Sequence, residues 1–316
     1  MRFAYPSYIN LHSTFMAKIL IVGCGSIGTQ LAEVLTAKGH QVVGLKRNPP
    51  VFDLITGIDY FKADISASET LKALPLDFDF VYFIVSPDGR NQESYEAIYK
   101  AGVNQLLAHF SKAETPPQWF FISSTSVYGQ TQGEWVDENS LSYPENRPSQ
   151  LIRLAEQRLI ALNAQHVIVR FSGIYGSGRE YLLRIARQVP AIQQDPPYYT
   201  NRIHQTDCVG VLVFLLECRL AGIGLESCYI ASDDDPAPTW EVMSWLAERL
   251  SCSIPSVKAM AQDALMNKRC NNERLKALGY QFNYPSYKDG YAKLIADSLA
   301  QISAQDVPTL KGASFK

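Results

Sequence analysis

Residues 18–47 read KILIVGCGSIGTQLAEVLTAKGHQVVGLKR, and this stretch decides the fold. An apolar run of strand length ends in Gly23, Gly25 and Gly28, a helical pattern follows, and a second apolar run closes the unit. This order of strand, glycine turn, helix and strand is a fingerprint for binding a dinucleotide. Gly23 allows the tight turn, Gly25 lets the backbone approach a pyrophosphate, and Gly28 lets the helix pack on the strand.

The helix that begins near Ser26 is expected to hold the phosphates, because its first N–H groups have no partner within the helix. We therefore place Ser26 and Ile27 in the cofactor site beside the glycines. The expected buried face of this helix carries Ile27, Leu31, Val34 and Leu35. Gly39 stands where a C-terminal helix cap belongs. The alternative is a glycine turn that binds nothing.

The residues after the second strand bear on which dinucleotide is bound. An acidic residue near this position would hydrogen-bond the ribose 2′-hydroxyl of NAD. Lys46 and Arg47 stand there instead, and two cations can pair with the 2′-phosphate of NADP. We therefore predict NADP, with NAD possible. The alternative is that Lys46 and Arg47 only solvate the end of a strand.

Composition is typical of a globular protein with a large core. The chain has 316 residues, 47% of them apolar, which fits one large α/β domain with an appended lobe. Its 29 Lys and Arg balance 31 Asp and Glu, so charge gives no reason to expect binding to nucleic acid or to an anionic membrane. The apolar run at Val211–Leu216 is far too short to span a bilayer.

Cysteine usage and the N-terminal residues indicate a cytoplasmic protein. The six cysteines form no CxxC pair, which gives a metal site little support and favours reduced thiols. Residues 1–15 lack the pattern of a signal peptide. Met16 precedes the first strand, and we expect it to be the true start, with 1–15 a loose extension and 304–316 a loose tail.

Strand and helix patterns alternate along most of the chain. Strands are expected at 60–63, 78–85, 118–123, 166–171 and 227–231, and helices at 91–110, 149–162 and 207–218. Strands that are apolar throughout predict a parallel sheet with both faces covered. The expected fold is therefore an α/β, Rossmann-type doubly wound parallel sheet with a small C-terminal substrate lobe.

The pattern loosens beyond Gly176, where prolines and tyrosines interrupt it. We therefore expect residues 16–176 to form the dinucleotide-binding Rossmann domain. Residues 177–303 are expected to form a smaller substrate-binding part that is interleaved with the Rossmann core.

Further motifs follow the glycine turn. They are Asp64-Ile65, SSTSVYG at 123–129, RFSGIYG at 170–176, and His204-x-x-Asp207. Together they resemble the extended short-chain dehydrogenases/reductases, also called the NAD-dependent epimerase/dehydratase family, over about residues 17–295. The resemblance implies that Asp64 holds the adenine, with Ile65 and Val85 in the same cofactor site. It also implies that Ser124 hydrogen-bonds the reacting oxygen and that Tyr175 lies near the nicotinamide.

The sequence departs from this family at one important place. Members carry Tyr-x-x-x-Lys at the start of the helix that follows the SSTSVYG block, and an ungapped count puts Pro148 and Ile152 at these positions. Hydride transfer to a carbonyl leaves an alkoxide that a positioned acid must protonate. A tyrosine with a pKa of about 10 needs a neighbouring ammonium group for this role. Since proline and isoleucine can do neither job, the chain resembles an atypical branch of the family.

Several side chains are candidates to act in place of the missing pair. Ser124 is predicted to face the cleft and orient the reacting oxygen; the alternative is a serine that caps a turn. Tyr128 in the SSTSVYG block and Tyr175 in the RFSGIYG block belong to loops that the resemblance places near the reaction, so each could be a proton donor. Aromatic packing is the alternative for each. Tyr143 and Arg147 have the i, i+4 spacing, but they stand five residues early in a polar loop.

Other polar residues have less specific signals. His204 and Asp207 could be an acid/base or metal pair, although packing and capping are favoured. Arg179 could reach an anionic substrate or be a solvated loop residue. Arg153 could contact ribose or lie on the exposed face of its helix. The run at 233–235, three aspartates, is interpreted as a solvated turn.

Two functions are compatible with these patterns. The first is an NADP-dependent oxidoreductase or epimerase-like enzyme that acts on a small polar, sugar- or nucleotide-like substrate. The second is a non-catalytic NADP-binding sensor or regulatory protein. Pro148 and Ile152 favour the second, whereas Ser124 and the Tyr175 loop favour the first, which we prefer. The resemblance also implies a possible homodimer through helices at about 95–110 and 149–162.

Overall fold

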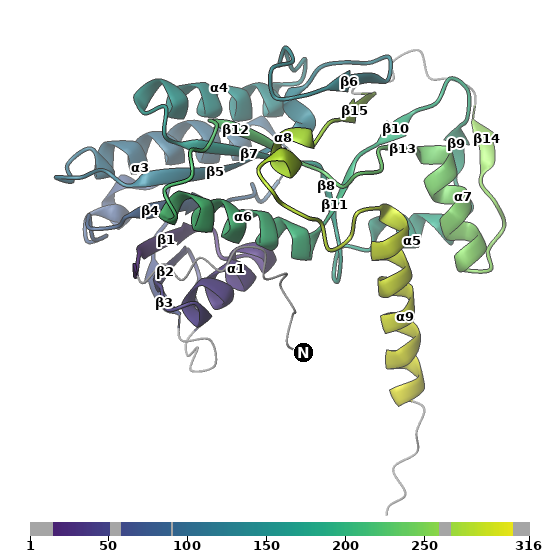
Figure 1. Ribbon diagram of the computed structural model, residues 1–316, viewed down its shortest axis with the longest axis horizontal. Coiled ribbons are helices and arrows are strands. Elements are labelled where there is room, and N and C mark those ends of the chain that lie inside the picture. The colour runs from purple at the N-terminus through teal and green to yellow at the C-terminus, as the bar shows by residue number, and fades with distance from the viewer. Residues whose placement is uncertain (1–14, 51–57, 90, 259–266, 306–316) are drawn as a thin grey trace, which may run out of the picture.

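A seven-stranded parallel sheet crosses the molecule in the order β12-β7-β5-β4-β1-β2-β3 (Figure 1). The strands are β1 Lys18–Val22, β2 Gln41–Lys46, β3 Asp59–Lys62, β4 Phe80–Phe83, β5 Gln118–Ser124, β7 Val167–Phe171 and β12 Cys228–Ala231. The chain moves outward from β1 to β3 and then returns to the other side of β1 at β4. Such a reversal leaves a crevice at the carboxyl ends of the strands. The predicted Rossmann-type α/β fold is confirmed.

This computed structural model describes residues 15–50, 58–89, 91–258 and 267–305. The predicted extension at 1–15 lies outside the described residues except for Phe15, and the predicted tail at 304–316 lies outside them from residue 306 onward.

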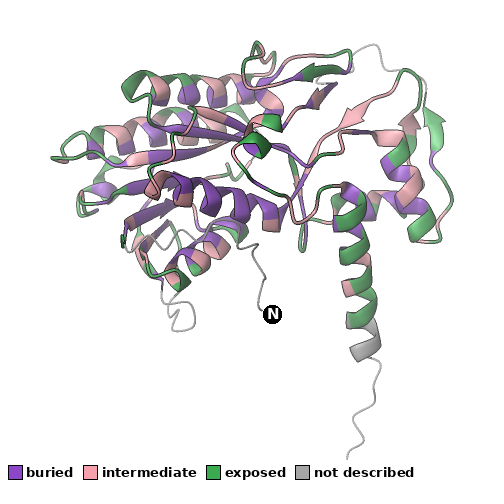
Figure 2. Cartoon of the chain, viewed as in Figure 1, coloured by how far each residue is buried: buried purple, intermediate pink, exposed green. Residues whose placement is uncertain are grey.

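Helices cover both faces of the sheet (Figures 1 and 2). One face is covered by α1 Ser26–Ala37 and α6 Gln205–Leu220, and the other by α3 Val103–Phe110 and α4 Arg147–Leu162. Successive side chains of β1 face opposite sides of the sheet. Ile19 and Ile21 pack with α1 and α6, whereas Leu20 and Val22 pack with α3 and α4. This two-sided burial explains why the strand is apolar throughout.

The helix predicted at 91–110 contains a change of helical type. It begins as α2 Gln92–Tyr95, continues as a π-helical segment at Glu96–Gly102, and ends as α3. A Cβ atom on Gly102 would lie 2.7 Å from the Ile65 side chain, so the segment packs closely on the loop after β3. Segments of π-helix are rare and often occur at functional sites.

The C-terminal part packs around a core of its own. Helices α5 Tyr181–Ala186, α7 Thr239–Arg249 and α9 Tyr287–Gln305 enclose a cluster that includes Val242, Met243 and Leu246. Four two-stranded ladders were not predicted. They are β6 Glu134–Val136 with β15 Lys268–Cys270, β8 Gly173–Tyr175 with β11 Arg202–His204, β9 Ala191–Gln193 with β14 Ser256–Lys258, and β10 Tyr199–Thr200 with β13 Ala237–Pro238. Between these segments, α6 packs on the main sheet and β12 pairs with β7 at its edge.

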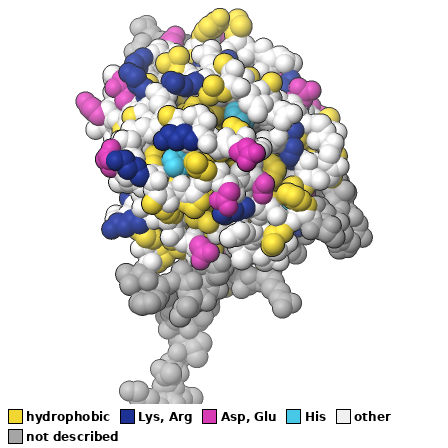
Figure 3. Space-filling model, turned by 90° about the vertical axis from the view of Figure 1, so that its left-hand side faces the viewer, with side chains coloured by type: hydrophobic (Ala, Val, Ile, Leu, Met, Phe, Trp, Pro, Cys, Tyr) yellow, Lys and Arg dark blue, Asp and Glu magenta, His cyan; other side chains and the backbone are white. Residues whose placement is uncertain are grey.

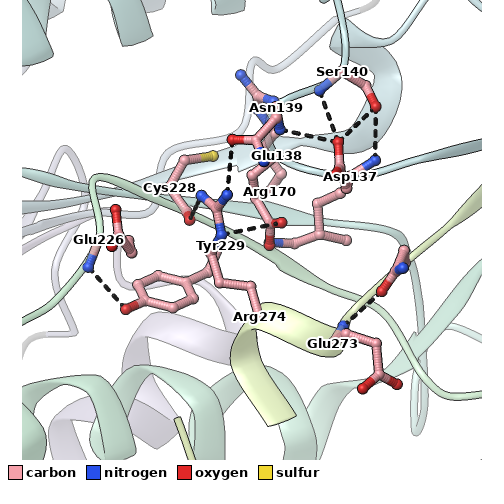
Figure 4. A network of polar contacts seen from close by, with 12 residues as sticks. Asp137, Glu138, Asn139, Ser140, Arg170, Glu226, Cys228, Tyr229, Glu273 and Arg274 are labelled. Carbon is pink, nitrogen blue, oxygen red and sulfur yellow. Dashed lines mark hydrogen bonds and ion pairs between the residues drawn. The ribbon is translucent and has the colours of Figure 1, made fainter. Parts of the chain in front are cut away.

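Strand β12 lies at the edge of the main sheet, and a polar network covers its outer side (Figure 4). The network includes Arg274 of α8 Glu273–Ala277. Glu138 accepts a hydrogen bond from the Ile230 N–H of β12 at 2.7 Å and lies 3.4 Å from Arg274 Nε. Arg274 also donates to Asn139 Oδ1 at 2.9 Å. Covering an edge in this way prevents pairing with another chain.

The surface carries both signs of charge. On the face shown in Figure 3, basic and acidic side chains are interspersed. In the part of the chain that the structure describes, no helix combines the length and the apolar character needed to cross a membrane.

Candidate functional site

A cleft of about 930 Å³ opens at the carboxyl ends of β1, β4, β5 and β7. The structure brings all ten residues predicted to bind a cofactor to its walls. They are Gly23, Gly25, Ser26, Ile27, Gly28, Lys46, Arg47, Asp64, Ile65 and Val85. Ser124, Pro148 and Ile152 line the same cleft. Positions that are far apart in the sequence therefore meet in one site, as the Rossmann topology requires.

The three glycines of the turn have different environments. Gly23 has a φ of +99°, and a Cβ atom there would lie 2.4 Å from the carbonyl oxygen of Ile84. A Cβ atom on Gly28 would lie 2.2 Å from the carbonyl oxygen of Gly23, whereas one on Gly25 would meet nothing within 4 Å. Packing therefore demands glycine at the first and third positions, and Gly25 keeps space open above the N-terminus of α1. This open space suits a diphosphate on the helix N–H groups.

The two predicted cations, Lys46 and Arg47, lie at the rim of the cleft after β2 and differ in their contacts. Arg47 forms a bidentate ion pair with Asp88, in which both N···O distances are 2.6 Å. Both side chains are exposed, so the pair stabilises the fold only slightly. Lys46 is half-buried and forms no ion pair with any described residue. Of these two cations, Lys46 is therefore the one that could bind a ligand without first breaking an ion pair.

Asp64 is held in a tight turn at the same rim. Its Oδ1 accepts hydrogen bonds from the N–H of Ser66 at 2.8 Å and from the Ser66 hydroxyl at 2.7 Å. Tyr95 at the end of α2 and Tyr99 within the π-helical segment also line the cleft. The Tyr99 hydroxyl donates to the carbonyl oxygen of Val85 at 3.2 Å. Their spacing of four residues on a helix was the available signal for these two tyrosines.

The other end of the cleft contains a group of serine hydroxyls. Ser124 Oγ accepts a hydrogen bond from the Ser126 N–H at 3.1 Å, and Ser126 Oγ accepts one from the Ser149 hydroxyl at 3.0 Å. All three residues line the cleft beside Pro148 and Ile152. Ser124 therefore combines the two roles weighed above, since it caps a turn and also faces the cleft. Ser126 and Ser149 were not predicted from the sequence as site residues.

Tyr128 lies in the core and does not line this cleft. Its hydroxyl donates to the carbonyl oxygen of Asp137 at 2.7 Å and accepts from Arg170 at 2.6 Å. Burial raises the pKa of Tyr128, which makes the phenol a poorer proton donor. The geometry therefore argues against the expected catalytic role, because both hydrogen-bonding positions are engaged by the fold.

Tyr175 is also buried away from the cleft walls. Its ring stacks on Tyr291 with a centroid distance of 4.5 Å, and its hydroxyl lies 3.4 Å from the carbonyl oxygen of Ser286. Burial raises the pKa of this phenol as well. The pairing of β8 with β11 directs Tyr175 into the C-terminal core, so aromatic packing is the role that the structure supports.

The buried carboxylate of Glu156 in α4 links β5 and β7 next to the serine group. Glu156, which is fully buried, accepts hydrogen bonds from Arg170 at 2.9 and 2.7 Å, from Arg153 at 2.9 Å and from the Ser123 hydroxyl at 2.5 Å. Arg170 continues the network to Tyr128. Arg153 thus pairs with Glu156, and of the two alternatives weighed for Arg153, contact with ribose has no support in this geometry.

His204 and Asp207 serve packing and capping. His204 Nδ1 accepts from the Thr206 N–H at 3.2 Å at the start of α6, and burial lowers the pKa of His204 to about 4. Asp207 accepts from the Tyr280 hydroxyl at 3.0 Å and from the N–H groups of Asn283 and Tyr284 at 2.7 and 3.0 Å. These contacts dock the segment at 280–284 on α6.

Two remaining expectations concern loop residues. The aspartate run was interpreted as a solvated turn, but Asp233 is only 1% exposed and burial raises its pKa. Its main chain explains this, because the Asp233 N–H donates to the carbonyl oxygen of Arg202 at 2.7 Å and draws the residue inward. Tyr143 is exposed and Arg147 pairs with Glu96 at 3.4 Å, and neither lines the cleft.

Comparison with known proteins agrees with this architecture. Residues 19–212 match the model of the NAD dependent epimerase/dehydratase family. Protein YeeZ of Escherichia coli K12 is 27% identical over 276 residues, covering 85% of this chain and 97% of YeeZ. A Methylobacillus flagellatus protein described as a candidate NAD-dependent epimerase/dehydratase is 34% identical, with a TM-score of 0.76, covering 90% of this chain and 100% of that one.

A more distant structure shares the fold. MoeE5 in complex with UDP-glucuronic acid and NAD has a TM-score of 0.71 at 19% identity, covering 90% of this chain and 99% of that one. The glycine turn, the parallel sheet with its switch point and the family match together lead to one conclusion. The chain belongs to the NAD-dependent epimerase/dehydratase family.

Proposed function

We propose that the cleft binds a nicotinamide dinucleotide, with NADP preferred over NAD. The observation that carries this proposal is the open space above Gly25 at the uncapped start of α1, in a cleft whose rim holds Lys46. A diphosphate would lie on the first N–H groups of α1, and Lys46 would face the 2′-phosphate. Arg47 would join it by exchanging Asp88 for the phosphate, since an exposed ion pair is weak.

We further propose an oxidoreductase or epimerase-like activity on a small polar substrate. The bound dinucleotide would supply or accept the hydride. Ser124 would orient the reacting oxygen, and a water molecule held by the hydroxyls of Ser126 and Ser149 would carry the proton, because Tyr128 and Tyr175 are engaged in the core. The structure of MoeE5 with a UDP-sugar supports a sugar- or nucleotide-like substrate class.

The alternative function is a non-catalytic sensor that binds NADP without turnover. Pro148 and Ile152 support it, because two apolar side chains line the cleft beside Ser124, where a proton donor would be needed.

We also propose a homodimer through α3 and α4. Leu154 and Leu162 of α4 are 54% and 62% exposed, which leaves apolar surface for such a contact.

Fluorescence titration with NADPH and NADH tests the cofactor proposal. Lys46→Ala combined with Arg47→Ala should weaken NADPH binding by about 1.5–3 kcal/mol, the range for charge-assisted hydrogen bonds, and leave NADH binding unchanged. Lys46→Ala alone should cost more than Arg47→Ala alone, because Arg47 must first leave Asp88. Equal affinity of the wild type for both nucleotides would overturn the NADP preference.

Turnover separates the enzyme from the sensor. NADPH oxidation is followed with a panel of carbonyl substrates for the wild type and for Ser124→Ala. Loss of turnover in the variant at unchanged NADPH affinity supports the enzyme. A wild type that binds NADPH tightly but oxidises it with none of the carbonyls supports the sensor.

A further inference from the structure

The loop after β8 holds an arginine in a fixed position at the cleft. The Arg179 N–H donates to the carbonyl oxygen of Gly176 at 2.9 Å, and the Gly178 N–H donates to Glu180 Oε1 at 2.8 Å. A Cβ atom on Gly176 would lie 2.5 Å from Cγ of Gln205, so the loop packs against the first turn of α6. The position of the Arg179 backbone is therefore set by the fold before any ligand binds.

The Arg179 side chain crosses the cleft to the glycine turn. Its NH2 group donates to Ser26 Oγ at 3.1 Å, and both residues line the cleft. Arg179 forms no ion pair with any residue in the described ranges. Ser26 is the first residue of α1. An exposed guanidinium without a carboxylate partner thus lies beside the helix N-terminus, where positive potential from the helix dipole is greatest.

We propose that Arg179 binds the diphosphate of the dinucleotide from the side opposite the glycine turn. This inference rests on the proposed cofactor binding and adds to it a residue from the C-terminal part of the chain. Guanidinium groups bind phosphate oxygens through two parallel hydrogen bonds. Since the diphosphate is common to NAD and NADP, Arg179 contributes affinity without choosing between them. The choice belongs to Lys46 at the other rim.

Titration of the full-length protein with nucleotides, in the absence of any substrate, tests this role. Arg179→Gln should weaken NADPH and NADH binding by the same factor, about tenfold. It should also reduce the dependence of affinity on KCl concentration, because one ionic contact is lost. Adenosine 2′-monophosphate has no diphosphate, so Arg179→Gln should leave its affinity unchanged. The matched control is Arg187→Gln, an exposed arginine at the end of α5 that does not line the cleft.

The outcomes separate the inference from the function on which it rests. Equal dinucleotide affinity in Arg179→Gln and Arg187→Gln would overturn the role of Arg179, and would mean that this arginine is solvated or serves a substrate anion. A wild type that binds neither dinucleotide would overturn both proposals. A larger loss for NADPH than for NADH would also contradict the assignment to the diphosphate. Thermal unfolding of both variants confirms that the exposed substitutions leave the fold intact.

Discussion

The two ends of the cleft differ in the chemistry that they present. The end that we propose to hold the cofactor, here named the cofactor end, has an open helix N-terminus, the glycine turn and a cation at Lys46 that has no ion-pair partner among the described residues. The end that we propose for the reaction, here named the reaction end, presents serine hydroxyls and the apolar side chains of Pro148 and Ile152. The nearby Tyr128 and Tyr175 are buried in contacts with the core. Groups suited to hold a phosphate therefore gather at one end of the cleft, and hydroxyl and apolar groups line the other.

The support beneath the two ends differs in the same way. Backbone geometry builds the cofactor end, where close contacts demand Gly23 and Gly28. A side-chain network centred on Glu156 builds the reaction end, next to Ser124. Substitutions at the two ends should therefore have different effects on stability and on binding.

Removing Glu156, at the reaction end, should lower the free energy of unfolding more than the other substitutions discussed here. In Glu156→Leu, Arg170 keeps a buried charge without its partner, so the free energy of unfolding should fall by about 3–5 kcal/mol in urea denaturation. Arg170→Met combined with Glu156→Leu should be less destabilised than Glu156→Leu alone, because the deeply buried charge of Arg170 is removed, whereas Arg153, whose side chain is 30% exposed, can turn to water. A single variant as stable as the wild type would show that the network does not organise this region.

Acid should destabilise the packing around Tyr175 through His204. Burial lowers the pKa of His204 from 6.5 to about 4, so the unfolded chain takes up the proton first as the pH falls. The contribution to stability is complete above pH 6.5 and is lost toward pH 4, at about 1.4 kcal/mol per pH unit. Urea unfolding at pH 7 and pH 4.5 should show a smaller loss for His204→Gln than for the wild type. His166, whose pKa burial also lowers to about 4, remains in the variant and keeps part of the slope.

Alanine at two glycines should separate fold from binding at the cofactor end. Gly28→Ala places a methyl group against the carbonyl oxygen of Gly23 and should cost about 1–3 kcal/mol of stability. Gly25→Ala meets no protein atom and should leave the unfolding free energy within about 0.5 kcal/mol, while its methyl group weakens dinucleotide binding. Urea denaturation and nucleotide titration of both variants check this. Unchanged nucleotide affinity in Gly25→Ala would show that no ligand approaches the turn there.

The cofactor end was predictable because its signals are local. The glycine spacing, the apolar strands and the basic pair after β2 lie within 30 residues, and each has a direct physical reason. The short ladders of the C-terminal part, such as β8 with β11, were not predictable, because segments of two or three residues carry too little periodicity. The direction of the Tyr175 side chain depends on one such ladder. A loop position in the sequence could not reveal it.

By itself the sequence determined the Rossmann-type sheet, the position of the glycine turn and the apolar residues Pro148 and Ile152, because these follow from periodicity and from the chemistry of single positions. Only the tertiary structure decided that Arg47 pairs with Asp88, that Tyr128 and Tyr175 are buried, and that Arg179 reaches Ser26. Those outcomes depend on contacts between residues up to 153 positions apart, and such contacts are fixed by packing and pairing geometry that no local pattern encodes.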